Sequence, residues 1–533
     1  PVTGDDGEPL ICTVEIAAEP VSFCAWVANV GRCPVYLLDT KLPINQPHFR
    51  DLTQHVYGGD DSTRIMQEIL LGAGGVRLLR RLGVSPSVFH LNEGHAAFLV
   101  LELMRERIAE GVSFDEALAE TRRQCLFTTH TPVPAGHDRF SHKLMDYAAR
   151  HFCGQLGVSA NELLALGRVD PADAGEEFCM TVLALKASRA ANGVSELHGQ
   201  VSREMWHGLY PNGSVDDVPI GHVTNGIHLA GWMKGPVRRF LRHKLNQADS
   251  GADWAEELAK PEFWARMQDA SFVSDEELWA LRYRLRRELI EFARRRLQDQ
   301  EHRSEPKDFI ALDHLLNPDA LTIGFARRFA TYKRAPLVFD HFENLVSLVR
   351  DLRRPVQFVF AGKAHPRDDE GKRLIQKIIH MSRHSKLSGH LVFLENYDVH
   401  VARQMVSGCD VWLNNPRRPL EASGTSGMKA TCHGCLNLSI LDGWWREGYD
   451  GTNGFAIGGD EHPDSVDEQD RLDSENLYKV LSGEVIPCFY DRDEIGIPRA
   501  WLGKIRRAMV TLAARYDTTR MVREYAQNFY LQE

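Results

Sequence analysis

Short apolar runs alternate with longer amphipathic stretches along most of this 533-residue chain. In the second half the apolar runs occupy residues 321–325, 358–360, 391–394, 411–413 and 436–440. Runs this short and this apolar are typical of strands that are buried on both faces of a parallel sheet. Helical patterns lie between them, for example over residues 371–385 and 400–407. The alternation predicts βα units, whose ligands gather at the carboxyl ends of the strands.

The first half shows the same alternation less regularly. Predicted strands occupy residues 35–39, 88–91 and 125–128, and a predicted helix covers residues 96–108. Ser113 and Glu116 form a capping box, which predicts the start of another helix. We therefore expect two α/β domains that face a cleft, divided at residue 228, with the second domain ending at residue 508. The last helical pattern predicts a closing helix within residues 509–533.

A strongly charged helical stretch joins the two halves. Its basic residues are Arg282, Arg284, Arg286, Arg287 and Arg294 to Arg296. Glutamates at 276, 277, 288 and 291 interleave with them. This mixture favours a solvated helix with i,i+4 ion pairs over a nucleic-acid-binding face.

Composition narrows the possible classes of protein. The chain is 43% hydrophobic and 26% charged, with a net charge of -10, as in a globular protein of two or more domains. The acidic balance disfavours nucleic acid and anionic membranes as partners. The longest apolar runs fall short of the ~20 residues that span a bilayer. Ten cysteines, with one isolated C-x-x-C at Cys432 and Cys435, give no metal site, and we expect a cytoplasmic protein.

Basic residues follow the predicted strand that ends at residue 325. Five positions separate Arg328 from Lys333, with Tyr332 beside the lysine. At the carboxyl end of a strand, both cations can face one anion, and a guanidinium and an ammonium are the groups that bind phosphate. The stretch favours a phosphate site over a basic surface loop.

A second stretch, from Glu421 to Lys429, is rich in small residues and hydroxyls. Glycine lets the backbone approach a ligand closely, and successive N–H groups can bind an anion. The lysine at its end is either a charge for that anion or an amine for covalent chemistry. A capped helix start with a surface lysine is the simpler interpretation, and this stretch alone leaves both open.

Polar residues also follow predicted strands in the first half. Glu93 and His95 follow one strand, and His130 follows the next. A further loop contains Asn225, with Trp232 beyond it. Amide and imidazole groups bond sugar hydroxyls, and an indole packs on the apolar face of a sugar ring. These residues favour a sugar site, although single histidines are more often structural.

These segments together resemble the α-glucan phosphorylases, the glycogen, starch and maltodextrin phosphorylase family. The resemblance runs from about Leu38 to the C-terminus and is closest to the bacterial and archaeal branch in residues 414–429 and 441–445. It implies a GT-B fold of two Rossmann-like, doubly wound domains, here with an incomplete N-terminal domain. It also implies phosphorolysis of terminal α-1,4-linked glucose, which gives α-D-glucose 1-phosphate with retention. The implied cofactor is pyridoxal 5′-phosphate, used for its phosphate group.

The resemblance assigns roles to the residues named above. Lys429 corresponds to the lysine that carries the cofactor covalently, and the implied cofactor-phosphate ligands are Arg327, Thr425 and Ser426, with Tyr397 near the ring. Arg328 and Lys333 correspond to ligands of the substrate phosphate, with Tyr332 beside them. The implied ligands of the glucose hydroxyls are Glu421, Ser423, Gly424, Asn225 and His130. His130 also supports the transition state, while Glu93, His95 and Trp232 form the surrounding wall.

Two departures from the family keep other hypotheses open. Pro1 stands where an initiator methionine is expected, and the family's upstream glycine-rich loop has no counterpart before Leu38. We therefore expect that an N-terminal part is missing, and an inactive glucan-binding remnant is one alternative. A nucleotide-sugar-dependent glucan synthase of the same fold is another, but it has no use for a cofactor lysine. The family also implies a possible homodimer.

Overall fold

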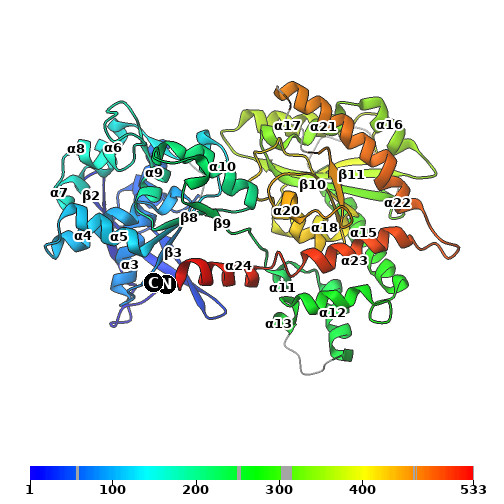
Figure 1. Ribbon diagram of the computed structural model, residues 1–533, viewed down its shortest axis with the longest axis horizontal. Coiled ribbons are helices and arrows are strands. Elements are labelled where there is room, and N and C mark those ends of the chain that lie inside the picture. Colours follow the sequence, from blue (N-terminus) through cyan, green and yellow to red (C-terminus); the bar gives the residue numbers. More distant parts are fainter. Residues whose placement is uncertain (56–58, 249–253, 302–314, 460–462, 464, 532–533) are drawn as a thin grey trace. The chain divides into compact units, whose positions relative to one another are not determined.

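The computed structural model describes residues 1–55, 59–248, 254–301, 315–459, 463 and 465–531, and it divides the chain into two compact units (Figure 1). The first unit contains Pro1–Val194, Gly199–His222 and Phe529–Glu533. The second contains Ser195–His198 and Val223–Asn528.

A six-stranded parallel sheet forms the centre of the second unit, in the order β12-β11-β10-β13-β14-β15. Its strands are β10 (Leu321–Phe329), β11 (Val356–Ala364), β12 (Leu391–Leu394), β13 (Val411–Asn414), β14 (Leu436–Ile440) and β15 (Phe455–Ile457). The predicted strands of the second half are thus confirmed, and β15 is an addition. The structure confirms the α/β class with parallel sheets.

Both faces of this sheet are buried, which explains the continuous apolar runs. In β11, Phe358 and Phe360 enter one core cluster, whereas Val359 and Ala361 enter another on the opposite face. Helices therefore cover both faces (Figure 1). The helices after residue 222 are α11 (Leu229–Trp232), α12 (Gly235–Ala248), α13 (Trp254–Leu258), α14 (Pro261–Ala265), α15 (Asp275–Glu301), α16 (Phe342–Arg350), α17 (Asp369–Ser382), α18 (Val399–Gly408), α19 (Ser426–Thr431), α20 (Trp444–Gly448), α21 (Val466–Val480), α22 (Ile486–Tyr490), α23 (Arg499–Leu512) and α24 (Thr518–Tyr525).

The first unit has its own parallel sheet, in the order β4-β5-β8-β9. Its strands are β4 (Phe89–Asn92), β5 (Cys125–Thr128), β8 (Ala190–Gly193) and β9 (Ile220–His222), and a short antiparallel pair adds β6 (Arg139–Phe140) and β7 (Phe178–Cys179). The helices are α1 (Pro47–Arg50), α2 (Asp61–Ile69), α3 (Gly75–Arg81), α4 (Leu99–Ala109), α5 (Phe114–Gln124), α6 (His142–Ala149), α7 (His151–Leu156), α8 (Ala160–Ala165), α9 (Met180–Lys186) and α10 (Glu196–Trp206). The capping box of Ser113 and Glu116 opens α5 as predicted.

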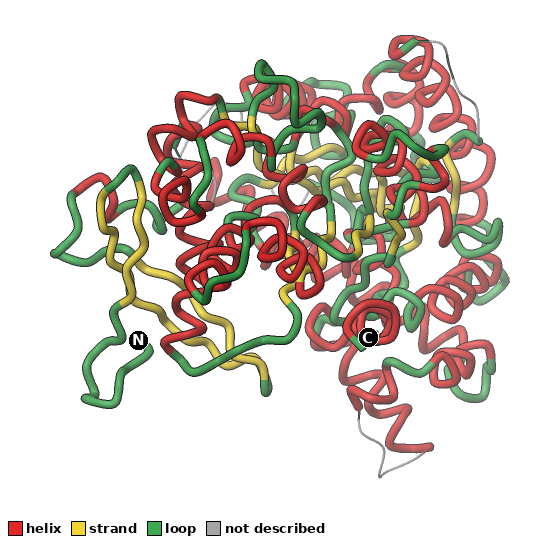
Figure 2. The backbone as a smooth tube through the Cα atoms, turned by 60° about the vertical axis from the view of Figure 1, so that its left-hand side comes forward, coloured by secondary structure: helices red, strands yellow, loops and turns green. Residues whose placement is uncertain are grey.

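The predicted strand at residues 35–39 belongs to a different kind of sheet. It lies in β3 (Cys33–Asp39), which pairs antiparallel with β2 (Glu19–Val30), and β2 pairs antiparallel with β1 (Cys12–Ile16). Figure 2 shows these long strands beside the N-terminus. The prediction of a βα unit here was wrong, because β2 continues directly into β3 through a tight turn at Gly31 (φ 60°).

The charged helix α15 is only partly solvated. Arg284 pairs with Glu288 at 2.9 Å, as the i,i+4 pattern predicts. In contrast, Arg282 and Arg286 are 0% and 1% exposed. Arg282 donates to the carbonyls of Ser407, His433 and Cys409, so it ties α15 to the second unit's core. The prediction of a wholly solvated helix was wrong for these two residues.

The predicted closing helix is two helices. α23 begins before residue 509 and ends at Leu512, and α24 begins only at Thr518. Between them the chain pairs with Ile227, whose N–H donates to Tyr516 O at 2.8 Å and whose carbonyl accepts from Thr518 N at 2.9 Å. Asp517 then caps α24. This backbone pairing outweighs the helical pattern of the sequence.

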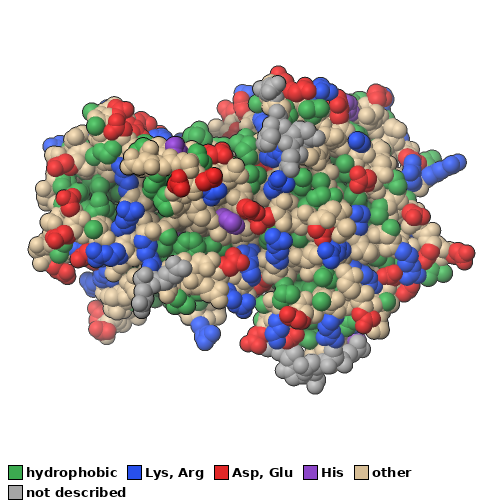
Figure 3. All heavy atoms as spheres, in the orientation of Figure 1, with side chains coloured by type: hydrophobic (Ala, Val, Ile, Leu, Met, Phe, Trp, Pro, Cys, Tyr) green, Lys and Arg blue, Asp and Glu red, His purple; other side chains and the backbone are tan. Residues whose placement is uncertain are grey.

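Among the described helices, none is long and apolar enough to cross a membrane. On the face drawn in Figure 3, acidic and basic side chains are interspersed.

Candidate functional site

The basic residues predicted from the sequence meet at the carboxyl edge of the second unit's sheet. Arg327 stands near the end of β10, and its Nη2 pairs with Glu421, from the loop after β13. Burial raises the pKa of Glu421, but Arg327, Lys333 and Arg328 outweigh burial, so the pKa lies below its usual value. The carboxylate is therefore ionised and faces three cations.

Lys333 is buried among these charges. Its side chain follows β10 in a short 3₁₀ turn, and its Nζ lies 5.2 Å from the centre of the Tyr332 ring. Burial, followed by Arg327 and Arg328, lowers the pKa of Lys333 to about 7, against the opposing effect of Glu421. Two like charges and little water disfavour the ammonium form. The cluster therefore has more positive charge than Glu421 neutralises.

Polar groups of the same cluster lack partners. The Nε and Nη1 atoms of Arg327 are buried and have no hydrogen-bond partner among the described residues, and the same holds for Ser423 Oγ. Buried donors are almost always satisfied in folded proteins, by protein, water or ligand. An anion beside Arg327 would satisfy both nitrogens and neutralise the excess charge.

The loop that contains Glu421 is held by tight backbone contacts. Asp442 accepts hydrogen bonds from Glu421 N at 2.9 Å and Gly443 N at 2.8 Å. A Cβ on Gly443 would lie 2.4 Å from Ser423 O, and φ is +52° there, so glycine is required. Burial above all raises the pKa of Asp442 to about 8, and the charge of Glu421 adds to this rise. Gly424, in the same loop, also has a left-handed backbone, with φ +85°.

Lys429 lies on α19 in an apolar setting. Its Nζ is 4.1 Å from the centre of the Trp232 ring, and burial lowers its pKa. Among the described residues, no carboxylate forms an ion pair with this amine. His433 donates from Nδ1 to Lys429 O at 2.7 Å, and its Nε2 accepts from Lys234 N at 3.0 Å. The imidazole thus links the lysine helix to the segment that contains Trp232.

Four further predicted residues lie in the second unit. Thr425 is the residue before α19, and Ser426 Oγ accepts from Trp412 Nε1 at 3.0 Å. Tyr397 follows β12, and the charge of Arg327 acts on its hydroxyl, although burial raises the pKa of that group. Asn225 offers its carbonyl to Arg520 Nη2 at 3.2 Å.

The remaining predicted residues lie together in the first unit. Glu93 accepts hydrogen bonds from His130 N and Thr131 Oγ1, both at 2.8 Å. The backbone of Glu93 is in the left-handed region (φ 68°), a conformation that non-glycine residues adopt mainly under local constraint. Partial burial, and then His95, lower the pKa of His130. Glu93 thus fixes the loop that contains His130.

His95 belongs to a group of three possible metal ligands with Glu68 and Asp138. Its Nε2 lies 3.5 Å from Asp138 Oδ2. The guanidinium of Arg64 contacts both carboxylates, at 2.9 Å from Glu68 and 3.0 Å from Asp138. This arginine already supplies the positive charge that the carboxylates attract, so the group forms an ion-pair network.

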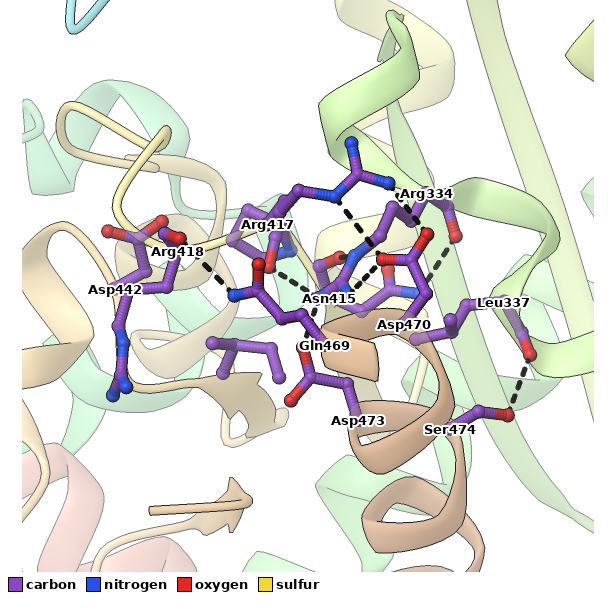
Figure 4. A network of polar contacts seen from close by, with 12 residues as sticks. Arg334, Leu337, Asn415, Arg417, Arg418, Asp442, Gln469, Asp470, Asp473 and Ser474 are labelled. Carbon is purple, nitrogen blue, oxygen red and sulfur yellow. Dashed lines mark hydrogen bonds and ion pairs between the residues drawn. The ribbon is translucent and has the colours of Figure 1, made fainter. Parts of the chain in front are cut away.

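Several residues that support the site were missed by the sequence analysis. They are Arg334, Asp442, His433, Asp470 and Asp473. Arg334 directly follows Lys333, and Asp442 lies in the 441–445 motif, so both had a signal in the sequence. Asp470 and Asp473 belong to α21, far along the chain, and had none. Figure 4 shows Arg334 and these two aspartates within one polar network.

Comparison with known proteins identifies the family. The family model described as carbohydrate phosphorylase matches residues 79–447. The maltodextrin phosphorylase of Thermococcus litoralis is 42% identical over 535 residues, and the glycogen phosphorylase of Mycobacterium tuberculosis is 41% identical over 545. Each match covers 99% of this chain and 61% of the relative, so the chain spans about three fifths of their length. The glycogen phosphorylase of Aquifex aeolicus is 38% identical, with 99% and 75% covered. The chain therefore belongs to the carbohydrate phosphorylase family.

Proposed function

We propose that this chain acts as an α-1,4-glucan phosphorylase on glycogen, starch or maltodextrin. It transfers the terminal glucose to inorganic phosphate and releases α-D-glucose 1-phosphate with retention, on a GT-B arrangement of two Rossmann-like domains. The observation that carries the proposal is the cluster of Arg327, Arg328 and Lys333 around the carboxylate of Glu421, in which Arg327 and Lys333 are buried and Arg328 is exposed. Such an excess of positive charge, partly buried, suits phosphate.

The residues present also fit pyridoxal 5′-phosphate. Lys429 offers a half-buried amine with a lowered pKa beside the Trp232 ring, as covalent attachment requires. Arg327, whose Nε and Nη1 lack partners among the described residues, would hold the cofactor's phosphate with Thr425 and Ser426. When bound, the cofactor supplies a second phosphate group with a pKa of about 6, suited to proton exchange at neutral pH.

The chain's own residues then serve phosphate and sugar. Arg328 and Lys333 hold inorganic phosphate, and Glu421 and Ser423 accept and donate hydrogen bonds at the glucose hydroxyls. The phosphate gives its proton to the glycosidic oxygen, the bond from C1 to that oxygen breaks, and a phosphate oxygen bonds to C1 on the same face. Glu421 is ionised and paired with Arg327, so it is unsuited to act as the acid.

The product distinguishes the candidate functions. The full chain, saturated with pyridoxal 5′-phosphate, is incubated with maltoheptaose and inorganic phosphate, and α-glucose 1-phosphate is measured by ³¹P NMR. We expect product from the unaltered chain and from Lys386→Met, an exposed lysine paired with Glu343, but very little from Lys333→Met. Glucosyl transfer from UDP-glucose without phosphate would favour a glucan synthase. Maltoheptaose binding without product would favour an inactive remnant.

A further inference from the structure

Arg334, the residue after Lys333, has an unusual environment for an arginine. Its side chain is 3% exposed. Its backbone is left-handed (φ 44°, ψ 42°), a conformation that is uncommon for residues other than glycine and that persists only where surrounding contacts hold it. The residue therefore needs strong local bonds, and the structure provides them (Figure 4).

The guanidinium of Arg334 joins two separate parts of the second unit. Nε donates to Asn415 O at 2.9 Å, and Nη2 donates to Pro416 O at 2.7 Å. Nη1 donates to Asp470 Oδ1 at 2.8 Å, while Nη2 also donates to Asp473 Oδ2 at 2.7 Å. The planar fork of an arginine can satisfy four acceptors in this way, which a lysine ammonium cannot.

Hydrogen bonds to backbone carbonyls join the same loops a second time. Asn415 Nδ2 donates to Arg334 O at 2.9 Å, and Arg417 N donates to Tyr332 O at 2.7 Å. Arg417 also pairs with Asp470 at 2.6 Å, so one carboxylate of α21 binds both arginines. The segment with Tyr332 and Lys333 is therefore fixed against the loop that leads to Glu421.

These hydrogen bonds oppose the electrostatic repulsion that acts on Lys333. Lys333 is buried near Arg327 and Arg328, and both repel its ammonium form. A free lysine side chain would move toward water, because its stem is flexible and its charge is strongly hydrated. The bonds of Arg334 hold the backbone of the preceding residue so that the amine stays beside Glu421.

We propose that Arg334 is a positioning residue that holds Lys333 in the anion site before phosphate binds. This inference rests on the proposed function, since it concerns the same phosphate site. Arg334 itself does not touch the reacting atoms; it acts through Lys333 and through the loop of Glu421.

The matched substitutions R334K and R506K test this role. Arg506 is also buried and donates to the carbonyls of Met267 and Val273 and to Asp275, in a different part of the second unit. The probe is sulfate, a dianion that resembles phosphate, titrated calorimetrically into the full chain. We expect R334K to bind sulfate about tenfold more weakly, while R506K changes the affinity less than about twofold and loses only thermal stability.

A second pair of substitutions, which perturb the structure less, tests the same role if R334K does not fold. D473N removes one charged acceptor of Arg334, and D275N does the same to Arg506. We expect about threefold weaker sulfate binding in D473N and none of this loss in D275N. Sulfate affinity that is unchanged in the folded R334K and D473N variants overturns the positioning role alone. A lack of sulfate binding by the unaltered chain overturns both this role and the proposed function.

Discussion

The affinity of the chain for sulfate should fall as the pH rises from 6 to 8. Burial and Arg327 lower the pKa of Lys333 to about 7, so its amine loses its proton within this range. Sulfate keeps two negative charges throughout, whereas inorganic phosphate changes its own charge. A change in sulfate affinity therefore reports on the protein.

The size of the effect follows from this pKa. The Lys333 amine is about nine-tenths protonated at pH 6 and about one-tenth protonated at pH 8. If sulfate binds the ammonium form, its affinity falls about tenfold, or about 1.4 kcal/mol. Asp442, with a pKa of about 8, acts in the same direction, because its carboxylate repels an anion once it is ionised.

Calorimetric titrations at pH 6, 7 and 8 separate the two groups. The unaltered chain and Lys386→Met, which alters an exposed lysine, should show the tenfold fall. Lys333→Met should bind sulfate weakly at pH 6 and lose most of the pH dependence. A tenfold fall that persists in Lys333→Met would show that the pH dependence comes from Asp442 or another group and not from Lys333.

Three further predictions concern stability and charge. Burial above all lowers the pKa of His433 from 6.5 to about 3, so the unfolded chain binds a proton below pH 6.5 that the folded chain does not. As the pH is lowered from 6 to 4, this residue should therefore reduce the free energy of unfolding by about 1.4 kcal/mol per pH unit. In urea denaturation, the free energy of unfolding of His433→Asn should depend less steeply on pH than that of the unaltered chain. Equal pH dependence in the two proteins would contradict this. Gly427→Ala places a Cβ 2.3 Å from Asn437 Oδ1 and should lower the free energy of unfolding by about 1–3 kcal/mol, whereas Gly503→Ala, with open space around it on α23, should raise it by about 0.5–1 kcal/mol. Equal changes of melting temperature in the two variants would argue against a steric clash with Asn437. Glu421→Gln removes the carboxylate that raises the pKa of Lys333, so the pH at which sulfate affinity falls should move below 7 while glucose 1-phosphate formation is lost; an unmoved pH dependence would contradict this.

The strands of the second unit were predictable because their signal is local. Residues 391–394 and 436–440 are strands with the predicted bounds, since apolar runs between helices have few other solutions. Residues 35–39 carried the same signal, but the residues of a strand do not determine which other strand it pairs with. The antiparallel pairing of β3 with β2 depends on the turn at Gly31, which the sequence analysis did not weigh.

The site was predictable where one short segment contains the chemistry. Arg327 and Arg328 lie near the end of β10 and Lys333 directly follows it, so their meeting could be expected. Their electrostatics depends on burial and on Glu421, 94 positions beyond Arg327, and the sequence gives no measure of either. The same limit hid Arg334, whose partner Asp470 lies 136 positions away. The same limit applies to Arg282 and Arg286 on α15, because their burial depends on acceptor groups from distant segments of the chain.

The decisive measurement is the position at which pyridoxal 5′-phosphate attaches to the chain. The full chain is incubated with the cofactor, reduced with borohydride and digested, and the pyridoxyl group is located by mass spectrometry. Lys386→Met serves as the control for a surface lysine. We expect one pyridoxyl group per chain, on Lys429, and none in Lys429→Met. Label spread over surface lysines, with none on Lys429, would rule out Lys429 as the cofactor lysine and with it the proposed function.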